Sequence, residues 1–211
     1  MFFCTVNNQI ELRLIDRQHD EELFTLLDSN REHLRRWDPW VDIISSTTDV
    51  RRAITGWQQQ YANHRGLYAG IWFNGRCCGM INHVNVDWLN RWAPISYWLD
   101  AAHQGRGIMT ACARAMVAHG FDTWNLNRLT IECATQNTRS RAIAERLGFT
   151  LEGIVRGIEW LQDCFVDHAM YGLLRSDHAN TSDYWDSKDG AAVAPVNIPL
   201  ALGHIASGRA L

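Results

Sequence analysis

The segment 66–86, GLYAGIWFNGRCCGMINHVNV, constrains the fold of this chain more than any other stretch. Two apolar runs flank the pair Asn74-Gly75. Asn followed by Gly is typical of a type I′ turn, because both central positions of that turn need a positive φ angle. The segment therefore predicts two antiparallel strands joined by a tight hairpin.

The other segments alternate between strand and helix patterns. Besides the hairpin, strands are expected at 10–15, 93–100, 128–134, 149–161 and 164–174. Helical spacing of apolar residues occurs at 20–37, 46–64, 138–148 and from Gly107 to about Trp124. The order β-α-α-β-β-β-α-β-α-β-β predicts one α/β domain over residues 1–175, with a mixed sheet. The segment 176–211 is polar and then rich in Ala, Gly and Pro, so we expect a loosely packed extension.

Composition argues against several classes of partner. A net charge of −3 and a pI near 6.3 do not suit a general nucleic-acid binder. No window approaches the roughly 18 apolar residues of a membrane span, and the start of the chain does not resemble a signal peptide. We therefore expect no nucleic acid, no membrane and a cytoplasmic location. The six cysteines show no CxxC pair and no zinc-like spacing, so reduced thiols and no metal are expected.

The stretch HQGRGIMT, residues 103–110, places two glycines directly before a helix. It is not a Walker loop, and Thr110 stands where a Rossmann fingerprint needs Gly. The loop could be a helix N-terminus whose backbone N–H groups bind a pyrophosphate, which the helix dipole attracts. A plain glycine-rich turn between a strand and a helix explains the loop equally well.

The surroundings of this loop resemble a known family. YWLD (97–100) precedes Gln104-x-x-Gly107, and Asn137-x-x-Ser140 and ERLGF (145–149) follow it. These motifs are similar to those of the GNAT superfamily of acetyl-CoA-dependent N-acetyltransferases, and more closely to its ribosomal-protein N-terminal (alanine and serine) acetyltransferases. The resemblance covers about residues 10–175. It implies a GNAT-like, mostly antiparallel central sheet with helices on both faces, acetyl-CoA as co-substrate, and a homodimer as one arrangement found in the subgroup.

The resemblance also implies how acetyl-CoA is held. Backbone amides of the glycine loop would bind the pyrophosphate, and Met109, which replaces the Gly or Ala of the wider family, still offers its amide. Main-chain groups of Trp98 and Leu99 would pair with the pantetheine arm like an extra strand. The expected cofactor-binding residues are Trp98, Leu99, Gln104, Gly105, Arg106, Gly107, Ile108, Met109, Asn137 and Ser140.

Two side chains are candidates for proton transfer. Many GNAT enzymes carry Tyr where this chain has Ala144, and in the resembled subgroup the motif serine, here Ser140, is the proposed acid for the leaving thiolate; Tyr171 is the alternative. Glu159 stands where the subgroup has its proposed general base, although an alternating strand would also let it face water. An N-terminal amine, with a pKa of about 7.7–8.0, needs only a modest base. A backbone N–H near Leu99 would stabilise the oxyanion.

The acceptor amine is expected near NREHLRRWDPWVD, residues 30–42. Trp37 and Trp40 would form flat walls, Arg35 would meet a carboxylate or phosphate, and His83 would reach the open centre of the sheet. Packed tryptophans, a solvated arginine and a core histidine are the simpler structural interpretations. A protein N-terminus is the expected acceptor. The alternatives are a small-molecule amine, such as an antibiotic or an aminoacyl nucleotide, and, in another class, an acetyl-CoA sensor without catalysis.

Overall fold

The computed structural model describes residues 3–178. The expected extension 176–211 therefore lies, apart from its first three residues, outside the described residues. The six cysteines are free thiols, and all but Cys164 are buried. No helix in the described range is long and apolar enough to cross a membrane.

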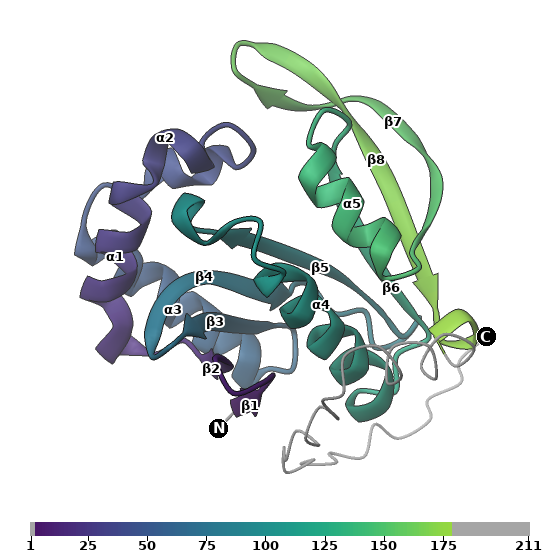
Figure 1. The fold of residues 1–211 in the computed structure, drawn as a ribbon, viewed down its shortest axis with the longest axis horizontal. Coiled ribbons are helices and arrows are strands. Elements are labelled where there is room, and N and C mark those ends of the chain that lie inside the picture. The colour runs from purple at the N-terminus through teal and green to yellow at the C-terminus, as the bar shows by residue number, and fades with distance from the viewer. Residues whose placement is uncertain (1–2, 179–211) are drawn as a thin grey trace, which may run out of the picture.

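One eight-stranded sheet organises the described residues (Figure 1). Its order is β1-β2-β3-β4-β5-β6-β8-β7, and all neighbouring strands are antiparallel except β5 and β6. This confirms the mixed, mostly antiparallel sheet. The strands are β1 (Phe3–Thr5), β2 (Ile10–Leu14), β3 (Leu67–Phe73), β4 (Arg76–His83), β5 (Trp92–Leu99), β6 (Arg128–Ala134), β7 (Thr150–Leu161) and β8 (Cys164–Leu174). The three residues of β1 are too few to show an alternating pattern, so β1 was not predicted.

Helices cover both faces of this sheet. Apolar residues of α4 and α5 join one core cluster with the inner strands, whereas α1, α2 and α3 contribute to a second cluster. The helices are α1 (Asp20–Ser29), α2 (Arg31–Leu34), α3 (Thr47–Ala62), α4 (Ile108–Ala118) and α5 (Thr138–Arg146). Short 3-10 helices are η1 (Arg17–His19), η2 (Pro39–Ile43) and η3 (Ala101–His103), and a π-helical turn, η4 (His119–Thr123), follows α4.

The single helix predicted at 20–37 is wrong, because Asn30 interrupts it. Asn30 has φ −112° and ψ 8°, and it is buried where the end of α1 meets η3. Its amide group donates to Leu26 O at 3.0 Å, and its side-chain oxygen accepts from Ala101 N at 3.1 Å. The second of these, to a residue 71 positions along the chain, fixes the α1–α2 corner against η3, which precedes the glycine loop.

The predicted hairpin is confirmed. Asn74 and Gly75 join β3 to β4 with φ angles of 49° and 78°. Both lie in the left-handed region, where Asn and Gly are tolerated better than other residues.

Strands β5 and β6 pair only at their beginnings. Trp92, Ala93 and Pro94 pair with residues 128–130. Beyond Pro94, β5 pairs with β4 alone and β6 pairs with β8 alone among the described strands. The two strands diverge in Figure 1 towards the loop that precedes α4. Backbone N–H and C=O groups along the facing edges are thus left for a ligand.

Candidate active site

A cavity of about 1510 Å³ lies at the divergence of β5 and β6. Its wall includes both strands, the loop before α4, the start of α5, the segment from α2 to η2, and the hairpin of β7 and β8. A site for one drug-sized ligand measures about 300–1,000 Å³. This cavity therefore has room for a large co-substrate and an acceptor together.

The glycine loop forms one end of the cavity. Gly105 and Gly107 have φ angles of +75° and +76°, and Gly107 is the N-terminal cap of α4. A Cβ atom added at either glycine would meet no atom within 4 Å, so backbone conformation, rather than packing, requires glycine here. No side chain caps α4, and its first N–H groups have no intrahelical acceptor. This arrangement fits an anionic phosphate.

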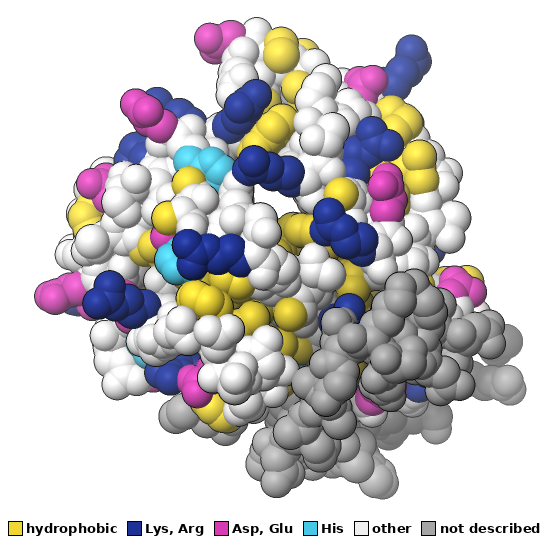
Figure 2. Space-filling view, viewed as in Figure 1, with side chains coloured by type: hydrophobic (Ala, Val, Ile, Leu, Met, Phe, Trp, Pro, Cys, Tyr) yellow, Lys and Arg dark blue, Asp and Glu magenta, His cyan; other side chains and the backbone are white. Residues whose placement is uncertain are grey.

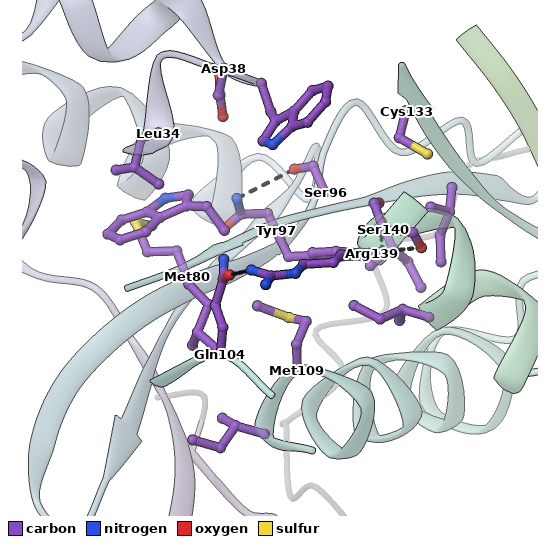
Figure 3. Close-up of a pocket in the computed structure, with 18 of the residues that line it drawn as sticks. Leu34, Asp38, Met80, Ser96, Tyr97, Gln104, Met109, Cys133, Arg139 and Ser140 are labelled. Atoms are coloured by element: carbon purple, nitrogen blue, oxygen red, sulfur yellow. Dashed lines mark hydrogen bonds between the residues drawn. The ribbon is translucent and has the colours of Figure 1, made fainter. Parts of the chain in front are cut away.

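Arginines surround this end of the cavity. Arg106, Arg139 and Arg146 line it, and Figure 2 shows Lys or Arg side chains around a hollow on this face of the molecule. Arg139 donates a hydrogen bond to the side chain of Gln104, whose amide nitrogen lies 2.8 Å from Nε2 of His33 (Figure 3). The positive charge complements an anionic ligand such as the pyrophosphate expected at this loop.

The divergence of the strands also brings Trp98, Leu99, Asn137 and Ser140 to the cavity. Asn137 is the N-cap of α5, and its side-chain oxygen accepts from Ser140 N at 3.2 Å. Its remaining amide N–H groups are the ones that could meet a pantetheine arm. Because Asn137 caps the helix, the Ser140 hydroxyl is not needed for that purpose.

Tyr97 of β5 contacts this hydroxyl and was missed in the sequence. Its phenol oxygen lies 3.0 Å from Ser140 Oγ and also donates to Ser140 O at 3.3 Å. Burial raises the pKa of Tyr97 well above its usual value, so the phenol keeps its proton at neutral pH. By contrast, Tyr171 bonds to Arg141 and Glu145 and does not line the cavity, so it is not placed to replace Ser140.

Glu159 reaches the other end of the cavity because β7 is bulged. Val155 pairs with His168, but the next paired residue, Glu159, faces Val166. Two extra residues of β7 are therefore accommodated, and Gly157, with φ +58°, donates its N–H to Asp167 Oδ1 at 2.8 Å. Glu159 and His168 line the cavity, with Oε2 and Nε2 2.8 Å apart.

Asp38, between α2 and η2, is a second carboxylate at this end. In Figure 3 its side chain projects from that segment towards the cavity. Burial raises its pKa to about 6, hydrogen bonds from Trp40 lower it, and the negative charge of Glu159 raises it. Glu159 therefore lies close enough to Asp38 for its negative charge to raise the pKa of Asp38.

The acceptor residues expected from the sequence divide into two groups. Trp37 and Trp40 line the cavity. Arg35 does not, because it is exposed and pairs with Asp42 at 2.6 Å. His83 is fully buried in the core, with Nε2 3.0 Å from Met116 O, so it has no access to the cavity. Arg35 and His83 are accordingly withdrawn as substrate-binding residues.

Sequence reasoning missed Tyr97, Asp38 and His168. Tyr97 stands inside YWLD and Asp38 inside RRWDPW, both already singled out for other residues. His168 stands beside Asp167, but adjacent strand residues face opposite sides of a sheet, so the two do not form a pair that the sequence can reveal. The signal that could have found His168 was Glu159 on the preceding strand of the same hairpin.

Relatives of known sequence show the family of this chain. The GNAT acetyltransferase domain matches residues 9–150. YdaF of Bacillus subtilis (strain 168), provisionally named a ribosomal N-acetyltransferase, is 36% identical over 178 residues, covering 84% of this chain and 97% of YdaF. The ribosomal-protein-serine acetyltransferase of Escherichia coli (strain K12) is 30% identical over 169 residues, covering 80% of this chain and 94% of that protein.

Solved structures share the fold. RimL, a ribosomal L7/L12 α-N-protein acetyltransferase with coenzyme A bound as a disulfide to one of its cysteines, has a TM-score of 0.80 at 28% identity, covering 82% of this chain and 97% of RimL. The microcin C7 self-immunity acetyltransferase MccE, in complex with acetyl-CoA and AMP, has a TM-score of 0.77 at 28% identity, covering 80% of this chain and 94% of MccE. The chain therefore belongs to the GNAT family of acetyltransferases and is an N-acetyltransferase with acetyl-CoA as its co-substrate.

Proposed function

We propose that the enzyme acetylates the α-amine of a protein N-terminus, in the manner of the ribosomal-protein acetyltransferases, by direct transfer in a ternary complex. The observation that carries this proposal is the position of Glu159. It is half-buried, hydrogen-bonded to His168, and faces the same cavity as Ser140 and the glycine loop. The names of the ribosomal relatives support the same acceptor.

The proposed mechanism assigns one step to each group. Glu159 takes a proton from the acceptor ammonium, directly or through one water. The free amine attacks the thioester carbonyl, and the backbone N–H near Leu99 stabilises the negative oxygen. As the C–S bond breaks, the attacking nitrogen gives its second proton to solvent and Ser140 gives a proton to the thiolate. The phenol of Tyr97, 3.0 Å from Ser140 Oγ, returns a proton to Ser140 and is itself reprotonated from solvent.

For the co-substrate, we propose that the pyrophosphate binds the amides of Gly105, Gly107, Ile108 and Met109. Arg106 and Gln104 support it from the same loop. The pantetheine arm then runs along the free edge of β5 at Trp98 and Leu99, where an added strand would satisfy the backbone. Asn137 would bond this arm from the opposite side.

A small-molecule amine is the second candidate acceptor. Trp37 and Trp40 line the cavity and could stack on a planar base. MccE, which resembles this chain in structure, was solved with AMP bound. An aminoacyl nucleotide would place its amine at Glu159 and its base between these rings.

The deciding experiment measures free thiol released from acetyl-CoA. The acceptor panel holds peptides with Ser or Ala N-termini, the same peptides with blocked N-termini and a free lysine, aminoacyl-nucleotide analogues, aminoglycosides and polyamines. Release with free N-termini alone supports the proposal. Release with a small amine alone replaces it with the second candidate, and tight acetyl-CoA binding without any release favours the sensor.

We also propose that a second copy of the chain docks on the hairpin of β7 and β8. β7 is an edge strand, and Figure 1 shows the hairpin extending past α5. Its exposed side chains include Ile154, Ile158, Trp160 and Phe165, of which Phe165 is 67% exposed. An edge strand with such a surface is a typical protein interface. The single domain over residues 1–175 and the cytoplasmic location stay predictions.

A further inference from the structure

The backbone holds Asp38 in a fixed position at the acceptor end of the cavity. Asp38 N donates to Leu34 O at 2.9 Å, and Val41 N donates to Asp38 O at 3.4 Å. Pro39 follows at the first position of η2 and restricts the chain further. The Asp38 side chain does not cap η2. Hydrogen bonds from the side chain and the backbone of Trp40 nevertheless reach its carboxylate, so the carboxylate is oriented by groups that carry no positive charge.

Asp38 also has no cation of its own. Two other aspartates of the N-terminal helical region are paired with arginine: Asp20 with Arg51 at 2.6 Å, and Asp42 with Arg35 at 2.6 Å. Among residues 3–178, Asp38 makes no salt bridge, and the charged group whose field reaches it is the carboxylate of Glu159. His168 also lines the cavity, and its Nε2 lies 2.8 Å from Oε2 of Glu159.

The free enzyme thus places two carboxylates beside each other in a partly buried space. Burying a charge costs free energy unless the charge is paired with an opposite one, and a like charge nearby raises that cost further. The raised pKa of Asp38, about 6, reflects both effects. A bound cation would relieve them.

We propose that Asp38 binds the ammonium form of the acceptor and selects cationic amines, while Glu159 removes the proton. Asp38 is then a binding residue whose charge lowers the KM of the acceptor. Trp40 donates to the same carboxylate and so orients it. The proposal requires an amine acceptor, and it holds for a protein N-terminus or a small amine alike.

The test compares Asp38→Asn with Asp42→Asn, which lies in the same segment but pairs with Arg35 outside the cavity. Steady-state rates are measured with the amine that the wild-type enzyme uses and with its aminooxy analogue, which is neutral at pH 7. For Asp38→Asn we expect the amine KM to rise about tenfold, corresponding to about 1.4 kcal/mol. The KM of acetyl-CoA, the rate at saturating amine and the KM of the aminooxy analogue stay within threefold of wild type. Asp42→Asn changes none of them.

Two results would overturn the proposal: an unchanged amine KM, or an equal rise for the aminooxy analogue, which would indicate shape rather than charge. If the proposed N-terminal acceptor is wrong, the result is different: peptides are then inactive with the wild-type enzyme itself. The variants would in that case be compared with the small amine that the wild-type enzyme acetylates.

A second measurement needs no acceptor. The folded-state pKa of Asp38, about 6, lies above the unfolded value of about 3.9. Its ionised form therefore destabilises the fold as pH rises from about 4 through 6. Asp38→Asn should melt a few degrees higher than wild type at pH 7 and show no such gain at pH 4. A lower melting temperature at pH 7 would mean that the carboxylate is structural and would overturn the proposal.

Discussion

Glu159 Oε2 lies 2.8 Å from His168 Nε2, although the register between their strands is broken between these two positions. The bulge at residues 156–158 makes this contact possible, because its two extra residues place Glu159 opposite Val166, closer along the strand to His168 on the face that both share. Asp167, on the other face of β8, holds the bulge through Gly157 N–H. His168 and Asp167, which are adjacent in β8, thus have separate roles: His168 contacts Glu159 in the cavity, and Asp167 holds the bulge of β7.

Removing either member of this pair should slow the reaction. Glu159→Gln is expected to reduce kcat/KM for the acceptor by about 10²-fold or more, the usual size of general-base catalysis. His168→Ala should reduce it on the order of tenfold, because Glu159 would lose its orientation but keep its charge. His168→Gln, which can still donate a hydrogen bond, should recover part of the loss. Equal rates for His168→Ala and wild type would show that Glu159 needs no support.

The Ser140 and Tyr97 hydroxyls can be separated in the same assay. Ser140→Ala should lower kcat by at least about 10²-fold while the affinity for coenzyme A, measured by calorimetry, changes little. Tyr97→Phe should lower kcat less, because Ser140 would still carry the first proton. If both variants lost affinity and kcat together, the hydroxyls would serve binding rather than proton transfer.

The glycine loop is tested by side chains of different size at one position. Gly107→Ala and Gly107→Trp impose the same left-handed strain, about 1–2 kcal/mol, but only Trp would project bulk towards the cavity. Coenzyme A affinity should fall modestly for Ala and be abolished for Trp. Gly75→Trp is the control, because Gly75 has φ +78° and open space in a distant turn. Normal binding by Gly107→Trp would contradict the pyrophosphate assignment.

The features predictable from sequence depend on local conformation. Asn74-Gly75 and the glycines before α4 all take positive φ angles, which few other residues adopt. The strands and long helices likewise follow from the period of apolar residues. These signals located the glycine loop and Asn137, because the loop and the cap lie at junctions between elements.

The remaining features depend on contacts between distant segments. The buried side chain of Asn30 interrupts a helical pattern through its bond to Ala101. Tyr97 meets Ser140 only because β5 and β6 diverge. Asp38 and Glu159 both line the cavity and lie close enough for Glu159 to raise the pKa of Asp38, and no periodicity within either segment encodes that meeting.

The hairpin surface predicts self-association. Phe165→Glu should shift the enzyme to a smaller species in sedimentation velocity, because a charge would have to be buried at the proposed interface. Leu89→Glu is the matched control, since Leu89 is 91% exposed in the turn before β5, away from the hairpin. Identical sedimentation of wild type and Phe165→Glu would contradict docking on this face.

Stability should fall in acid because of two buried histidines, His83 and His119. Burial lowers the pKa of His83 to about 4 and that of His119 to about 3, and their rings stack 6.2 Å apart against Trp124. The unfolded chain takes up these protons near pH 6.5, so it binds more protons than the folded state below that value. The free energy of unfolding should therefore be constant above about pH 7 and decline as pH falls from 6.5 towards 4, by several kcal/mol in all.

Urea titrations between pH 7.5 and 4 measure this decline. His119→Phe removes one of the two titrating groups while keeping an aromatic ring, so its stability should decline less steeply than that of wild type. His64→Gln, at an exposed position, should follow the wild-type curve. If His119→Phe lost stability as steeply as wild type below pH 6.5, the acid sensitivity would have to come from other groups.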